Sequence, residues 1–235
     1  MTAFYRIAEF MARAPGNVLS SLVEAVRTIF GGDPALRQRV AFSIAIIALS
    51  AKMAKADGVV TPAEVRAFHQ IFQVPREEVR NVTRLYDLAK RDVAGFEAYA
   101  RQMMELCRTC PKNCPMLEDI LDALFHIAKA DGAIHEQEEA FLARVAEIFG
   151  LSEDRFAQIR ARHMAGEGNP YLVLGVGADA PFQEVRRRYR HLVAENHPDR
   201  LIARGVPEEF IAIANERVAA LNAAYEQIER ARQPA

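Results

Sequence analysis

Residues 181–199 read PFQEVRRRYRHLVAENHPD, and they decide the fold of the C-terminal part of the chain. Their apolar side chains recur at helical spacing, so the pattern predicts an amphipathic helix with a basic opposite side. Proline disfavours the α conformation of the residue before it, which predicts that this helix ends before His197-Pro198-Asp199. The tripeptide is therefore expected in a loop.

A second helix is predicted from residue 207 to about residue 230, because apolar residues recur there at intervals of three and four. Its apolar stripe consists of Phe210, Ala214, Val218, Leu221, Tyr225 and Ile228. The stripe of the first helix consists of Val185, Tyr189, Leu192 and Val193. We expect the two stripes to pack as an antiparallel hairpin that holds a loop, residues 196–206, at its tip.

The order of motifs over residues 169–231 resembles a J domain, the module that switches on DnaK-type chaperone ATPases. Asn169-Pro170-Tyr171 and Leu174-Gly175-Val176 open the segment, and Asn222-Ala223-Ala224-Tyr225 closes it. The resemblance implies that His197, Pro198 and Asp199 trigger ATP hydrolysis by the chaperone. It also implies a docking face made of Arg186, Arg187, Arg188 and Arg190. Taken alone, these four arginines would indicate a solvated charge run or a surface for nucleic-acid phosphates.

An internal repeat organises the first two thirds of the chain. Ala54-Lys55-Ala56-Asp57-Gly58 recurs as Ala128-Lys129-Ala130-Asp131-Gly132, which favours two helical hairpins related by duplication. Helices are expected near residues 36–56, 61–73, 76–90, 93–108, 116–130 and 137–149. This arrangement resembles the TerB domain of tellurite-resistance proteins over residues 35–163.

The acidic residues of the repeat allow two interpretations. Each aspartate is followed seven residues later by a glutamate, which gives the set Asp57, Glu64, Asp131 and Glu138. Helix capping explains these residues without a ligand, since the glycine suits a helix end and the glutamate suits a capping box. Alternatively, the four carboxylates converge on a hard divalent cation such as Ca²⁺ or Mg²⁺, the one cofactor that the sequence suggests.

Cys107, Cys110 and Cys114 form a cluster in a turn that contains two prolines. A structural zinc site needs four ligands, and no histidine stands at zinc-finger spacing. We expect reduced, incidental thiols, with a redox pair or a cluster site as the alternative.

Composition limits the partners. The 235 residues include 30 basic and 31 acidic side chains, so no overall field recruits nucleic acid or an anionic membrane.

The most apolar run, residues 40–51, is shorter than the roughly 20 residues of a membrane span. The sequence shows no signal peptide and no hydrolytic or phosphate-loop motif, so we expect a cytoplasmic protein that is not an enzyme. Two amphipathic stretches before residue 34 pack on the following domain or contact the inner face of a membrane.

These features predict an all-α protein of four parts: an amphipathic segment at 1–34, a TerB-like helical domain at 35–164, a linker at 165–168 and a J domain at 169–235. The combination resembles the DjlA family of bacterial co-chaperones. It implies a co-chaperone that binds a DnaK-type chaperone and stimulates its ATP hydrolysis, while the TerB-like domain provides targeting or sensing. The alternative is a metal-binding stress-response module in which the J domain is secondary. The sequence does not identify the client.

Overall fold

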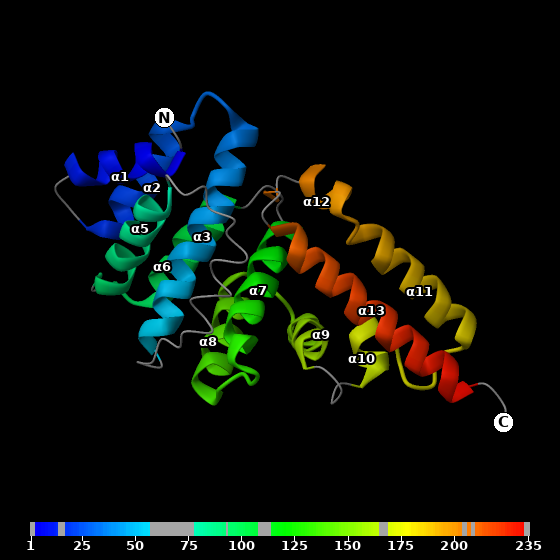
Figure 1. Cartoon of the computed structure of the whole chain (residues 1–235). Helices are drawn as coiled ribbons and strands as arrows, with labels where there is room; N and C mark the ends of the chain where they lie inside the picture. The colour runs from blue at the N-terminus through cyan, green and yellow to red at the C-terminus, as the bar shows by residue number, and fades with distance from the viewer. Residues whose placement is uncertain are drawn as a thin grey trace.

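A computed structural model gives the fold and describes residues 3–13, 17–56, 78–92, 94–107, 114–164, 169–203, 206–207 and 210–232. All regular secondary structure in these ranges is helical, which confirms the predicted all-α class (Figure 1). The predicted helix at 61–73 and the linker at 165–168 lie outside the described residues.

The centre of the N-terminal part is α3 (Pro34–Ala56). Its apolar residues from Val40 to Ala54 are buried on all sides, as expected of a helix that neighbours surround. The helices around it are α5 (Val79–Arg91), α6 (Phe96–Cys107), α7 (Pro115–Ala128) and α8 (Glu136–Ile148). A 3₁₀ turn, Lys129–Asp131, follows α7 and ends at Gly132, whose φ of 106° favours glycine.

The two amphipathic helices near the N-terminus pack on this core. They are α1 (Ala3–Arg13) and α2 (Val18–Ile29), and the side chains of Ile7 and Val26 are fully buried. Asn17 caps α2 by accepting a hydrogen bond from the Leu19 N–H at 2.9 Å. Among the helices in the described ranges, none has the length and apolar character of a membrane span.

α9 (Glu153–His163) follows α8, and its Ile159 is buried in the core around α3. The C-terminal part consists of α10 (Pro170–Leu174), α11 (Phe182–Glu195), α12 (Pro198–Ala203) and α13 (Ile211–Arg232). Figure 1 shows α11 and α13 as neighbouring antiparallel helices, with α12 at one end of the pair. A second apolar cluster lies between them and α10, and it contains Val173, Leu174, Val185, Leu192, Leu221, Ala224 and Ile228.

The prediction of a loop over all of residues 196–206 is wrong, because α12 forms within it. Pro198 is the first residue of α12, where the missing N–H costs nothing. The His197 carbonyl then accepts hydrogen bonds from the N–H groups of Arg200 at 2.9 Å and Leu201 at 3.2 Å. The proline therefore ends one helix and begins another.

The first half of α13 also departs from the prediction. Only its second half belongs to the cluster with α11, whereas Ile213 and Ala214 are buried in the α3 core together with Phe210. The rings of Phe210 and Phe42 meet edge to face, with centroids 4.8 Å apart. The apolar stripe of α13 thus serves two cores in succession. It joins the TerB-like part to the J segment, residues 169–232, which is named for its resemblance to a J domain.

Candidate functional site

The tripeptide His197-Pro198-Asp199 presents its polar side chains to solvent. The side chain of His197 is 59% exposed and that of Asp199 is 88% exposed. The Asp199 N–H donates a hydrogen bond to Nδ1 of His197 at 3.3 Å, and the Asp199 carboxylate lies 3.6 Å from the same nitrogen. Both groups are therefore available to a partner.

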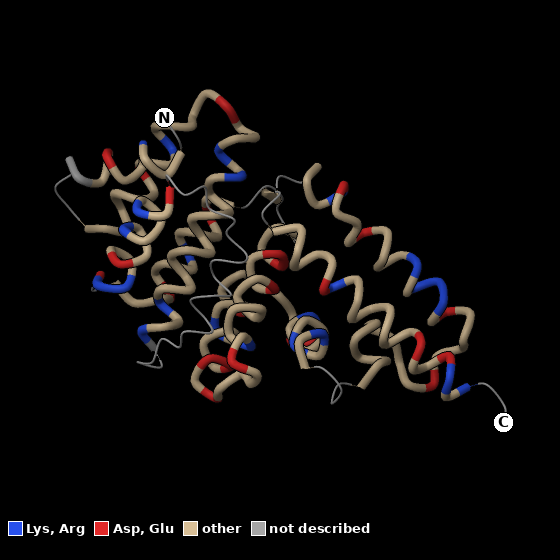
Figure 2. The backbone as a smooth tube through the Cα atoms, in the orientation of Figure 1, with Lys and Arg blue, Asp and Glu red and all other residues tan. Residues whose placement is uncertain are grey.

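The predicted basic face lies on α11, where Figure 2 shows basic residues gathered along the helix. Arg186, Arg187 and Arg190 are exposed. Arg188 differs, because it is partly buried and its Nε donates a hydrogen bond to the Leu174 carbonyl at 3.3 Å. The exposed basic face of α11, the helix that precedes the tripeptide, therefore contains three of the four predicted arginines.

A buried polar cluster that the sequence analysis missed lies beneath the tripeptide. The Arg217 guanidinium of α13 donates to Oδ1 of Asp119 and to Oδ2 of Asp122, both on α7 and both at 2.8 Å. Its Nη1 also donates to Oδ1 of Asn196 at 2.7 Å. All four side chains are buried, and Arg217 links α7 to the residue that precedes the tripeptide.

Burial and charge oppose each other in this cluster. Burial alone would lower the pKa of Arg217, but the carboxylates of Asp122 and Asp119 outweigh burial and raise this pKa. For Asp122 the directions are reversed: burial alone would raise its pKa. The charges of Arg217 and Arg162 and the contact with His163 outweigh burial and hold this pKa well below its usual value. The ion pair between Arg217 and Asp122 therefore remains charged across the ordinary pH range.

His163, at the end of α9, belongs to the same cluster. Its Nε2 lies 3.0 Å from Oδ1 of Asp122, and its ring stacks on Phe125 with centroids 5.3 Å apart. Burial lowers the pKa of His163 and outweighs the opposing charge of Asp122. The ring therefore stays neutral at pH values at which an exposed histidine would begin to take up a proton.

We predict that acid destabilises the chain through His163. The unfolded ring binds a proton near pH 6.5, whereas the folded ring binds one only at lower pH. The unfolded state holds more protons between these two values, so stability is lost as pH falls through this window. Urea midpoints measured at about pH 7.5 and about pH 5.5 should differ less for His163→Gln than for the natural protein. His191→Gln is the matched control, because it makes the same substitution at an exposed position. A pH dependence unchanged in His163→Gln would refute the assignment.

The acidic residues of the second repeat copy make local capping contacts. Oδ1 of Asp131 accepts the Ala133 N–H at 3.3 Å, and Oδ2 lies 3.1 Å from Nε2 of His135. Glu138 accepts the His135 N–H at 2.9 Å, as in a capping box. In the part of the chain that the structure describes, no three His, Cys, Asp or Glu side chains form a group suited to a metal. Asp57 and Glu64 lie outside the described residues.

Cys107 and Cys114 are buried thiols, and Cys110 lies outside the described residues. Sγ of Cys114 lies 3.8 Å from the Cys107 carbonyl oxygen. Burial raises the pKa of Cys107, which keeps it in the less reactive thiol form.

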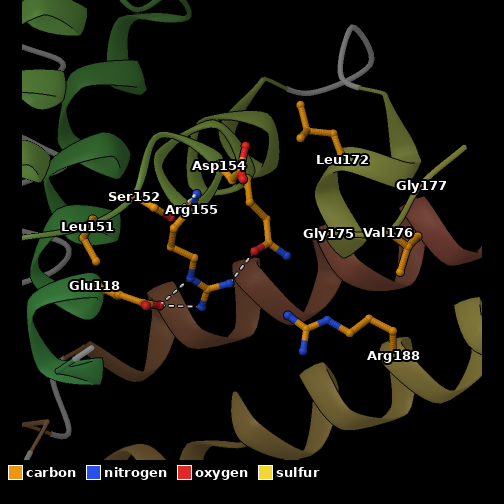
Figure 3. A pocket seen from close by; sticks show the side chains of 11 residues that line it. Glu118, Leu151, Ser152, Asp154, Arg155, Leu172, Gly175, Val176, Gly177 and Arg188 are labelled. Carbon is orange, nitrogen blue, oxygen red and sulfur yellow. Dashed lines mark hydrogen bonds and ion pairs between the residues drawn. The ribbon is translucent and has the colours of Figure 1, made fainter. Parts of the chain in front are cut away.

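A pocket of about 530 Å³ marks the seam between the two parts of the chain (Figure 3). Arg155 extends from α9 and Arg188 from α11, and the Arg155 guanidinium pairs with Glu118 and with Gln158. Glu118 and Asp154 balance the two arginines, so the lining favours neither anions nor cations.

The chain is similar to known proteins over most of its length. The family described as "Tellurite resistance protein TerB" matches residues 43–161. A protein named "Co-chaperone protein DjlA" from Photobacterium profundum is 31% identical over 216 residues, which cover 80% of this chain and 77% of that protein. The protein of the same name from Shewanella oneidensis is 28% identical over 86% of this chain and 81% of its own length. The one from Coxiella burnetii is also 28% identical, over 77% of this chain and 73% of its own length. No solved structure matches the chain.

Proposed function

Because this chain belongs to the DjlA family of co-chaperones, we propose that it binds a DnaK-type chaperone and stimulates ATP hydrolysis by that chaperone. The chain is a co-chaperone that contains a TerB domain, which matches residues 43–161. We assign the triggering role to His197, Pro198 and Asp199 and the docking role to the exposed arginines of α11. The protein itself catalyses no reaction in this proposal, and the TerB domain provides targeting or sensing.

One observation supports the proposal best. The side chains of His197 and Asp199 are exposed at one end of the pair formed by α11 and α13, directly after the helix that carries the exposed arginines. Positive charge along α11 can steer an acidic partner, and the tripeptide then lies within reach of the docked surface. The test is steady-state ATP hydrolysis by a DnaK-type chaperone with and without the full chain. A rate that the full chain leaves unchanged would refute the proposal.

We predict that reversing two docking charges weakens the interaction. The double variant Arg187→Glu, Arg190→Glu should need an about tenfold higher concentration for half-maximal stimulation, because each reversal replaces attraction by repulsion. The matched control is Arg80→Glu, Arg84→Glu, which makes the same charge change on the exposed side of α5. Equal loss in both double variants would mean that overall charge, and not the α11 face, controls docking.

A nucleic-acid surface on α11 predicts different behaviour. Phosphate binding needs only the positive charges and weakens steeply with salt, because each neutralised phosphate releases counterions. Chaperone stimulation should also need the tripeptide, so Asp199→Asn should remove stimulation while the basic face stays intact. DNA binding that is tight at physiological salt and unchanged in Asp199→Asn, without chaperone stimulation by the natural protein, would contradict the proposed function.

A further inference from the structure

Asn196, the residue before the tripeptide, is fixed by contacts on three of its polar groups. Its backbone N–H donates to the Leu192 carbonyl at 3.0 Å, and its side-chain Nδ2 donates to the same carbonyl at 2.7 Å. Its Oδ1 accepts a hydrogen bond from Arg217 at 2.7 Å. Asn196 therefore fixes the end of α11 relative to α13, one residue before His197.

Arg217 connects this contact to the TerB domain. The guanidinium uses Nη1 for both Asn196 and Asp119, while Nε binds Asp122. The planar guanidinium group holds several hydrogen-bond acceptors in fixed directions, whereas the ammonium group of a lysine would not. Residues of α7 thus restrict where Asn196 lies.

Stability alone does not account for a buried polar cluster at this position. Apolar side chains of similar volume are often as stabilising as a buried ion pair, because both charges lose their hydration. The same junction already contains the apolar Phe42–Phe210 contact. What the cluster adds is directional hydrogen bonding to Asn196, and hence a defined position for the residues that follow.

We propose that Arg217 is a positioning residue for chaperone stimulation. Arg217 holds the trigger tripeptide in place through its hydrogen bond to Asn196. Asp119 and Asp122 of the TerB domain in turn hold Arg217. This inference rests on the proposed function. Arg217 is 7% exposed and so acts through Asn196 without touching the chaperone. The TerB domain then contributes to the activity of the J segment as well as to targeting.

Asn196→Ala tests the link, because it removes the bond from Arg217 and leaves both ion pairs of Arg217 intact. It also removes the bond from Nδ2 to the Leu192 carbonyl, which Asn196→Asp removes as well, so the difference between these two variants isolates the Arg217 contact. Amide hydrogen exchange at Arg200 and Leu201, whose N–H groups bond to the His197 carbonyl, should become about tenfold faster in the variant, a change typical of losing one charged hydrogen bond. The maximal stimulated rate of ATP hydrolysis should fall by about the same factor. The half-maximal concentration should change much less, because the arginines that dock remain in place.

Two further variants separate positioning from a general loss of packing. Asn222→Ala removes the bond between Asn222 and the Tyr189 hydroxyl, also between α11 and α13, and should leave amide exchange at Arg200 and the maximal rate unchanged. Asn196→Asp keeps an oxygen acceptor for Arg217 and should retain most of the stimulation. Recovery in Asn196→Asp would assign the effect to the Arg217 contact.

The exchange measurement needs no chaperone, so the two proposals can fail separately. If the natural protein does not stimulate the chaperone, the proposed function is wrong, and exchange in Asn196→Ala still decides whether Arg217 holds the tripeptide. If the natural protein stimulates and Asn196→Ala matches it in either exchange or maximal rate, the positioning role is wrong. Equal effects of Asn196→Ala and Asn222→Ala would also overturn it.

Discussion

His197→Gln in the full chain is expected to reduce chaperone ATP hydrolysis to its unstimulated rate while the helical content stays unchanged. The imidazole is more than half exposed, and its ion-pair partner is the even more exposed Asp199. Replacing it removes a group that the chaperone can contact and leaves the two cores intact. Steady-state ATP hydrolysis and far-ultraviolet circular dichroism of the same preparation measure the two parts of this prediction.

The control for this experiment is His191→Gln. His191 lies on α11 six residues earlier, is similarly exposed and pairs with Glu195 at 3.3 Å. The same substitution there should preserve stimulation, because His191 is not part of the tripeptide. If His197→Gln stimulates as well as the natural protein, the tripeptide is not the trigger.

The sequence predicted the parts of the candidate site that depend on neighbouring residues. The tripeptide, the basic helix and the capping box at His135 and Glu138 are all set by residues within one or two turns of each other. Local periodicity and capping are sufficient to place such features. The helix α12 was missed because Pro198 suits both the end of one helix and the start of the next.

The buried cluster could not be derived in the same way, because its members are far apart in the chain. Arg217 lies 95 residues from Asp122 and 98 from Asp119, and no local pattern pairs residues at such separations. One feature of the sequence does point to the buried cluster. Arg217 stands three residues after Ala214 and four before Leu221, on the apolar stripe of its helix. An arginine on an apolar stripe indicates a buried partner of opposite charge.

Phe210→Ala is expected to lower the free energy of unfolding by about 3–5 kcal/mol, the usual cost of removing a large side chain from a core. Phe210 is 3% exposed and packs edge to face on Phe42, at the junction between the TerB domain and the J segment. Urea denaturation followed by circular dichroism measures the loss. Phe182→Ala is the matched control, because Phe182 is a partly buried phenylalanine that stacks on Tyr225 within the J segment, with centroids 5.9 Å apart.

The comparison of the two variants shows whether the junction is part of the main core. Because Phe182 lies at the rim of the smaller cluster, its removal exposes less apolar surface and should cost clearly less than the removal of Phe210. A cost for Phe210→Ala no larger than that for Phe182→Ala would mean that the J segment is attached only loosely to the TerB domain. A larger cost for Phe210→Ala means that α13 is held against α3, which is the condition under which Arg217 can transmit the position of α7 to the tripeptide.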